Sequence, residues 1–172
     1  GVQLFLARHA YANATWHDLL AAVGDAAHRD LAGWGRHWML RPGMTEIETR
    51  MDIRNGRIAN LALVQAPVQS SVSGQGSWPL RSRIVLAYRT APCTGPCTSI
   101  DTVATLTPID VDLRGPVTDV PSARGRQAPA FVYANFEDYG YQLTRLDTAS
   151  RRVLLDGTLA GVADPFLRAM LW

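Results

Sequence analysis

The sequence contains no lysine and only two cysteines among its 172 residues. All 17 basic residues are therefore arginines, and with 15 acidic residues the net charge is +2. The arginines are scattered along the chain and are not interleaved with stacking aromatic residues, so the composition does not favour a nucleic-acid partner. We attribute the absence of lysine to codon bias in a GC-rich genome, because no focused positive field accompanies it.

Long apolar runs and a basic segment followed by an apolar run are also missing. A membrane-spanning helix needs about 20 apolar residues, and a signal peptide begins with a basic segment followed by an apolar run. We therefore expect no membrane segment and a cytoplasmic location.

The two cysteines, Cys93 and Cys97, occur in the run Cys-Thr-Gly-Pro-Cys. No second Cys or His pair lies at a matching spacing for structural zinc, so we interpret this run as a turn with two incidental thiols; a local disulfide is the alternative, although thiols in a cytosolic protein normally stay reduced.

Motifs of known catalytic sites are absent as well. The sequence has no GxSxG elbow, no P-loop and no GxGxxG after a strand. The four histidines lack the i, i+4 spacing of a metal-binding helix, so we interpret them as surface residues. They are His9, His17, His28 and His37. From these patterns we predict no catalytic, cofactor-binding or metal-binding residue in this chain.

Two groups of polar residues remain as weaker candidates. Asp110 and Asp112 point to one face of a predicted strand, and we interpret them as a solvated strand edge. The best local candidate for a binding surface has two carboxylates and two phenols, and its simpler interpretation is a polar hairpin tip with packed tyrosines. This second group is Glu137, Asp138, Tyr139 and Tyr141.

The first zone, residues 1–45, is predicted to be helical. A first helix is expected to end near Asn13, and Thr15 with Asp18 forms a capping-box pattern that begins a second. Asp30 is predicted to cap a third helix, which ends before Pro42.

The second zone, residues 46–149, has the period of two that is typical of strands. Alternation from Ile47 to Ile53 predicts a half-buried strand, and the following Asn55-Gly56 predicts a type I′ hairpin. A phase slip after this turn indicates a bulge, and residues 66–79 are expected to form a loop. Further strands are predicted at about 81–89, 100–113, 116–120, 130–135 and 141–147.

The third zone, residues 150–172, becomes helical again. Leu154, Leu155, Leu159 and Val162 indicate one helix, and Asp164 with Pro165 begins another. The predicted fold is therefore mainly β: an antiparallel β-sandwich of about seven strands, flanked by N-terminal and C-terminal helices.

Three segments together resemble the aminopeptidase N-type zinc metallopeptidases, the gluzincins. They are His9-Ala-Tyr-Ala-Asn-Ala-Thr15, the run from Asn135 to Arg145-Leu-Asp147, and Asp164-Pro165 to Trp172. The resemblance implies that residues 1–45 end a thermolysin-like catalytic domain, that 46–149 form its β-sandwich domain, and that 150–172 begin a C-terminal helical domain. The family's HExxH helix, further Glu ligand and GAMEN loop do not occur here.

The resemblance thus implies a structural spacer from an enzyme that removes N-terminal residues from peptides. Zinc and the peptide substrate would belong to the parent enzyme, and we expect this segment alone to be inactive and to bind no zinc. Because the terminal helices would have lost their neighbours, we also expect a homodimer through their apolar residues. The alternative is a free-standing β-sandwich binding module for a protein or carbohydrate partner.

Overall fold

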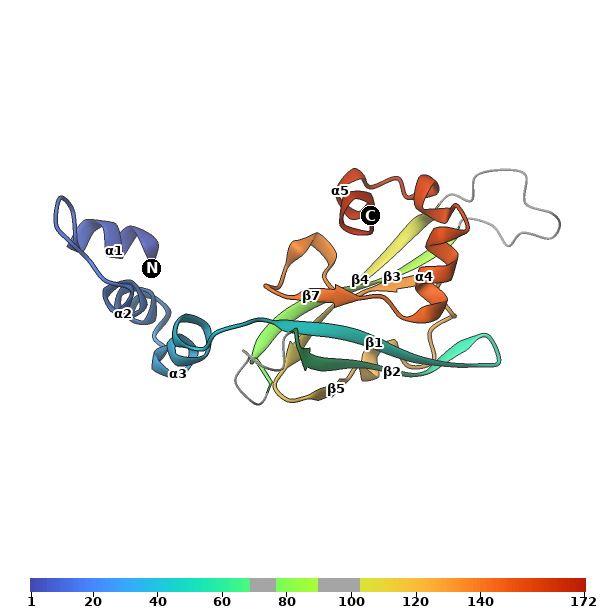
Figure 1. Ribbon diagram of the computed structural model, residues 1–172, viewed down its shortest axis with the longest axis horizontal. Helices are drawn as coiled ribbons and strands as arrows, with labels where there is room; N and C mark the ends of the chain where they lie inside the picture. Colours follow the sequence, from blue (N-terminus) through green and yellow to red (C-terminus); the bar gives the residue numbers. More distant parts are fainter. Residues whose placement is uncertain (69–76, 90–102) are drawn as a thin grey trace. The chain divides into compact units, whose positions relative to one another are not determined.

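A computed structural model describes residues 1–68, 77–89 and 103–172, apart from the side chain of Ala104. Both cysteines and most of the predicted 66–79 loop lie outside the described residues. The chain divides into two compact units, Gly1–Pro42 and Gly43–Trp172. Each unit is described separately below, and their helices and strands are labelled in Figure 1.

The first unit begins with α1 (Val2–Arg8) and α2 (Trp16–Ala27). The predicted capping box is confirmed: the Thr15 side chain accepts from Asp18 N, and Asp18 Oδ2 accepts from Thr15 N at 2.8 Å. The predicted end of the first helix near Asn13 is wrong, because α1 ends at Arg8. Tyr11 has a φ of 58°, and a right-handed helix cannot contain that left-handed backbone conformation.

A third helix follows as predicted, in two parts. The short helix α3 (Ala32–Gly35) continues directly into a π-helical stretch, η1 (Arg36–Leu40), which ends before Pro42. The N-cap of α3 is Leu31 and not the predicted Asp30, although Asp30 Oδ1 accepts from Ala32 N at 2.8 Å just before the helix. The rings of Trp34 and Trp38 lie 6.3 Å apart along it.

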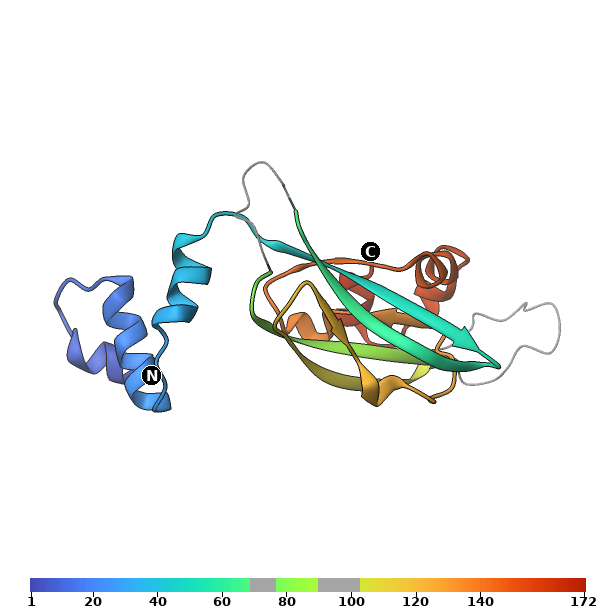
Figure 2. The ribbon, with the colours of Figure 1, turned by 90° about the horizontal axis from the view of Figure 1, so that it is seen from below.

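The second unit opens with a long hairpin of β1 (Thr45–Arg54) and β2 (Arg57–Pro67). The predicted turn is confirmed: Asn55 and Gly56 both have positive φ, 51° and 70°, as a type I′ turn requires. The predicted bulge is also present. Asp52 pairs with Asn60 but Ile53 pairs with Ile58, which leaves one additional residue on β2. Figure 2 shows the twisted ribbon that results.

Five further strands complete two sheets, in the orders β5-β2-β1-β7 and β4-β3-β6. They are β3 (Leu80–Arg89), β4 (Val103–Leu113), β5 (Val117–Asp119), β6 (Phe131–Tyr133) and β7 (Leu143–Arg145). The expectation of wholly antiparallel sheets is wrong at one pair, because β7 runs parallel to β1. The chain leaves β6 through the 3₁₀ turn η3 (Phe136–Asp138) and returns beside β1 in the same direction.

The middle of strand β3 is buried on both faces, since Ile84–Ala87 are all 0% exposed. On β3, Ile84 and Leu86 face a core shared with the other sheet, and Val85 and Ala87 face a core shared with helices. This alternation produces the continuous apolar run of β3, which is typical of a strand covered on both sides. The buried residues shared by the two sheets include Ile47, Ile58, Leu61, Leu63, Leu113 and Val132.

The helical layer on the β4-β3-β6 sheet contains α4 (Thr148–Leu155), the 3₁₀ turn η4 (Thr158–Gly161) and α5 (Pro165–Met170). The single helix predicted from Leu154 to Val162 is wrong. Gly157 has a φ of 101°, which ends α4 and starts the separate turn η4. The predicted start of α5 is confirmed, since Asp164 Oδ1 accepts from Phe166 N and Leu167 N.

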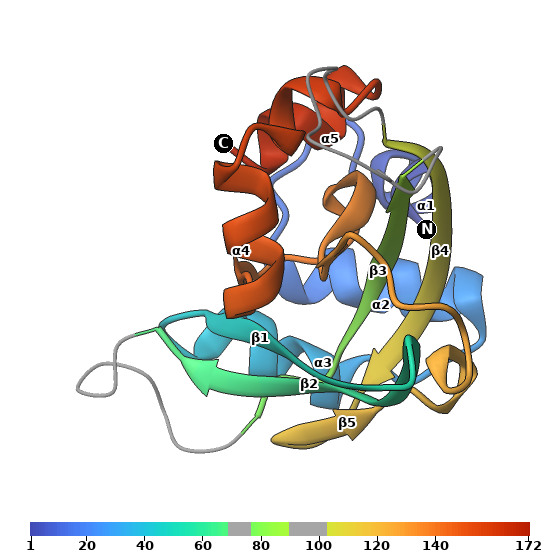
Figure 3. The ribbon, with the colours of Figure 1, turned by 90° about the vertical axis from the view of Figure 1, so that its right-hand side faces the viewer.

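The described residues contain five α-helices beside seven strands, so the fold class is mixed α and β and not mainly β. The two mostly antiparallel sheets share one core. In Figure 3 the β1–β2 ribbon crosses β3 and β4, with α4 beside them.

Candidate functional site

The most highly charged cluster that the structure describes lies across β3 and β4. The register places Arg81 opposite Asp112 and Arg83 opposite Asp110. Arg83 Nε lies 2.6 Å from Asp110 Oδ1, and Arg81 Nη2 lies 3.3 Å from Asp110 Oδ2. Both aspartates are exposed on β4, which is an edge strand, as their interpretation as a solvated strand edge expects, and cross-strand arginines pair with both of them.

Arg83 also joins this pair to the second predicted group. Its Nη1 donates to Glu137 on η3, and its guanidinium lies 4.6 Å from the centre of the Tyr139 ring. Two groups that sequence reasoning kept apart thus meet at one arginine. Tyr141, the last residue of the second group, is 70% exposed.

Arg83 determines the electrostatics of this cluster. Its hydrogen bond to Asp110 lowers the pKa of that carboxyl, against a smaller opposing effect of burial. The hydrogen bonds to Asp110 and Glu137 in turn raise the pKa of Arg83. The charged forms are therefore favoured at neutral pH, and Asp110 has no pKa near 7 for general acid–base catalysis.

The turn that carries Glu137 has an unusual backbone. Glu137 and Asp138 have φ values of 62° and 50°, a conformation that non-glycine residues adopt only when the surroundings enforce it. Asn135, only 2% exposed, supplies that enforcement. Its Nδ2 donates to Asp138 Oδ1 and Gly140 O at 3.1 and 3.0 Å, and its Oδ1 accepts from Gly140 N at 2.8 Å.

Sequence reasoning identified neither Arg83 nor Asn135 as an organising residue. For Arg83 a signal was available, since Arg81 and Arg83 have the same i, i+2 spacing as Asp110 and Asp112. Using it required the β3–β4 register, which side-chain patterns alone do not provide. For Asn135 the available signal was its position five residues before Gly140. Many loops have an Asn and a Gly at this spacing, so it does not predict the hydrogen bonds between them.

The histidines of the first unit do not converge. His17 stacks on Trp16 with ring centres 3.6 Å apart, His9 lies 5.2 Å from the Phe5 ring, and His37 Nδ1 is 2.9 Å from Gly33 O. Within residues 1–68, 77–89 and 103–172 no group of three His, Cys, Asp or Glu residues is placed to hold a metal ion.

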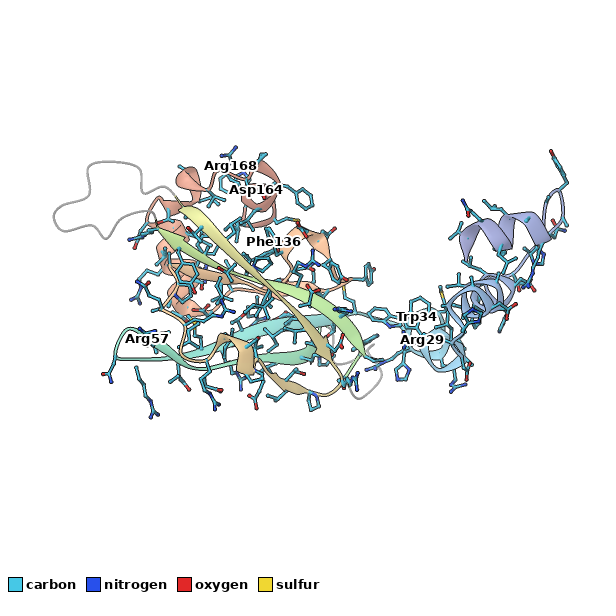
Figure 4. The ribbon with its side chains drawn as sticks, turned by 180° about the vertical axis from the view of Figure 1, so that it is seen from behind. Arg29, Trp34, Arg57, Phe136, Asp164 and Arg168 are labelled. Carbon is cyan, nitrogen blue, oxygen red and sulfur yellow. The ribbon has the colours of Figure 1, made fainter. Side chains whose placement is uncertain are left out.

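Large apolar residues are exposed in both units. In the second unit Leu155, Phe166 and Trp172 expose 75%, 51% and 96% of their surfaces. Met170 and Leu171, by contrast, pack against the helix-side core. Figure 4 shows Phe136, Asp164 and Arg168 on the side of the sheets where α5 lies. The described helices include none that is both long and apolar enough to cross a bilayer.

Comparison with known proteins gives one relevant similarity. The chain is 30% identical to an aminopeptidase N of Streptomyces lividans, over 177 aligned positions that include 100% of this chain. The aligned region makes up only 20% of that relative. No protein-family model matches the sequence. The chain therefore resembles one fifth of an aminopeptidase N along its entire length.

Proposed function

We propose that this chain is an inner, non-catalytic part of an aminopeptidase N-like metallopeptidase. In this proposal residues 1–45 end the catalytic domain, 46–149 form a β-sandwich spacer, and 150–172 begin a helical domain. The observation that carries it is the similarity to an aminopeptidase N over the whole chain, which spans 20% of that relative. Removal of N-terminal residues from peptides would be the activity of the whole enzyme.

Several residues that carry the family resemblance support a structural role, because they hold the backbone or join neighbouring strands. Thr15 completes a capping box, Asn135 closes the turn at 135–140, and Asp147 and Asp164 accept from the first amides of α4 and α5. Arg145 pairs with Glu46 across β7 and β1, with Nε 2.5 Å from Oε1. Caps and turns of this kind determine where helices begin and contribute no reactive group.

A spacer must transmit a fixed geometry from one neighbour to the next, and the second unit has the contacts to do so. Val132 N on β6 donates to Ser150 Oγ on α4 at 2.9 Å. Leu154 of α4 and Leu167 of α5 are buried in one core with Val85 and Phe131 of the sheet. The first helices after the sheets are therefore packed on them, and any domain that continues from α5 would inherit this orientation.

Zinc, the metal of the suspected parent, does not fit the described residues. A catalytic zinc site needs three protein ligands, and no group of three candidates lies together in the described part of the chain. We therefore assign zinc and its chemistry to the rest of the proposed parent and derive no catalytic step for this chain.

The exposed apolar residues support a second part of the proposal, self-association of the isolated chain. Leu155, Phe166 and Trp172 would bury apolar surface against a second copy, at about 25 cal/mol for each Å² removed from water. Light scattering should show a mass that rises from one chain towards two as concentration increases. A constant mass of one chain would refute this part alone.

The alternative, a free-standing binding module, would use the exposed Tyr139 and Tyr141, which are 43% and 70% exposed beside Glu137 and Asp138. Similarity along the whole chain to one aminopeptidase favours the spacer. Glycan and peptide arrays would separate the two, since a module should bind one ligand class through these tyrosines and a spacer should bind none.

The flanking reading frame provides the decisive test. We expect an HExxH helix and a further Glu ligand upstream, in frame with Gly1, and a helical region downstream. The purified chain should hydrolyse no aminoacyl chromogenic substrate and should contain no stoichiometric zinc by elemental analysis. An upstream frame without HExxH, or turnover above blank by the chain itself, would refute the proposal.

A further inference from the structure

A hollow at one end of the second unit has a different chemical character from the ion-pair cluster. It lies between the ends of β3 and β4 and the segment 126–130, and its volume is about 760 Å³. Small-molecule sites usually measure about 300–1,000 Å³, so the hollow is of suitable size. No acidic residue lines it among the residues that the structure describes.

One wall of the hollow carries hydroxyl groups. Tyr88 on β3 is directly opposite Thr105 on β4, and Thr107 follows two residues later on the same face. The Tyr88 hydroxyl donates to Gln127 O at 3.3 Å, which connects this wall to the facing segment. Thr105 is exposed and Thr107 half-buried, so their hydroxyls are accessible to a ligand.

The facing wall is apolar, with a cation at its rim, and a second cation, Arg89 at the end of β3, also lines the hollow and donates from Nη2 to Thr158 Oγ1 at 3.1 Å. Pro129, Ala130 and Val153 contribute carbon surface to the wall. Arg126 is the cation at the rim: its Nε donates to Ser122 O at 2.8 Å, which orients the guanidinium and leaves the two Nη groups available. The structure pairs Arg126 with no carboxylate of the described residues, whereas Arg81 and Arg83 are both in ion pairs.

The charge of Arg126 acts inside the hollow. Burial raises the pKa of the Tyr88 phenol, and the nearby Arg126 opposes that rise. Arg57, labelled in Figure 4, pairs with Gln127 through a backbone β-bridge, and its Nη1 donates to Gly125 O at 2.8 Å, so it does not line the hollow. A ligand with an apolar body and a planar anionic end would match this hollow. Its anionic end would accept hydrogen bonds from the guanidinium and the hydroxyl groups, and its body would pack against the apolar wall.

We propose that this hollow binds an amphipathic carboxylate, with the carboxylate on Arg126 and the apolar body against Pro129, Ala130 and Val153. A free apolar acid and the C-terminal residue of a peptide both combine an apolar body with a carboxylate, so either could be the ligand. This inference does not depend on the proposed function, because it rests only on the walls of the hollow.

Titrations of the isotopically labelled chain, followed by amide NMR, test the proposal. The probes are 3-phenylpropionate for a free acid, N-acetylphenylalanine for a peptide terminus, and N-acetylphenylalaninamide as the uncharged control. Both acids should shift the amides of Thr105, Thr107 and 126–130, and the amide probe should bind about 10-fold more weakly or worse, as expected for one lost charged hydrogen bond. Tighter binding of the peptide mimic would identify the peptide source, and tighter binding of phenylpropionate the free acid.

Matched variants separate a site from diffuse charge. Arg126→Gln should lower the affinity for the acids to that for the amide, and Thr105→Val should weaken acid binding severalfold. Arg124→Gln removes the same charge two residues away from an exposed position that does not line the hollow, and should leave affinity unchanged. Thermal unfolding confirms that each variant is folded. Equal affinity for acid and amide, equal losses in the two arginine variants, or shifts outside the hollow would overturn the proposal.

Discussion

Replacing Asn135 by alanine removes the side chain that holds the turn from 135 to 140. Three hydrogen bonds disappear: two donated by Nδ2, and one accepted from Gly140 N. Each contributes about 1 kcal/mol net, and a buried backbone group left without a partner costs about 1–3 kcal/mol. Because Asn135 is only 2% exposed, water does not readily replace these bonds. We expect the free energy of unfolding to fall by about 3 kcal/mol.

Thermal unfolding followed by the strand circular dichroism signal measures this effect. For a chain of this size about 3 kcal/mol corresponds to a fall of roughly 6–12 °C in Tm. Asp138→Asn is the matched control, since asparagine retains the Oδ1 acceptor and tolerates the positive φ of this position. A fall in Tm of under about 2 °C for Asn135→Ala would contradict the reasoning. An equal fall in both variants would show that the Asp138 contact, and not the Asn135 network, holds the turn.

Three further predictions concern a turn, a cap and an ion pair. Gly56→Ala should destabilise the chain by about 1–2 kcal/mol in urea unfolding, because Gly56 has a φ of 70°, and Gly115→Ala, which meets only Val117 O at 4.0 Å, should not. Asp147→Ala should cost about 1–2 kcal/mol through the lost bonds to Ala149 N and Ser150 N, whereas Asp147→Asn should retain most of the cap. The lowered pKa of Asp110 stabilises the fold above the ordinary carboxyl pKa, so this contribution should disappear as pH falls through the lowered value. Asp110→Asn should therefore show a shallower loss of stability as the pH falls below the ordinary carboxyl pKa, and an unchanged acid profile would refute that role.

The features that the sequence predicted well are those fixed by neighbouring residues. Asn55-Gly56 determines a type I′ turn because both positions need positive φ, and Thr15 with Asp18 determines a helix start through two reciprocal bonds. The seven strands were found because each has a short, strongly periodic or apolar run. None of these predictions requires knowledge of distant contacts.

The features that the sequence did not predict depend on contacts between distant residues. The parallel pairing of β7 with β1 joins residues about 100 positions apart in the chain, as the Glu46–Arg145 ion pair shows. The Arg83 cluster likewise depends on the β3–β4 register, which relates residues 27 positions apart. The break at Gly157 is a local exception: Asp156-Gly157 is a turn signal, but the apolar spacing continues across it, and Gly157 has a φ of 101°.

The position of β3 supports the proposal that this unit is a rigid connection, because β3 contributes to both cores. Its even-numbered residues Ile84 and Leu86 fill the core between the sheets, and its odd-numbered residues Val85 and Ala87 fill the core under α4 and α5. A tilt of α5 would therefore disturb one core directly and, through the shared strand, the other. Close-packed interiors resist such changes because even small voids cost free energy. The helices that follow the sheets are thus held by the same strand that holds the β1–β2 hairpin, which is the mechanical property that a spacer between two domains requires.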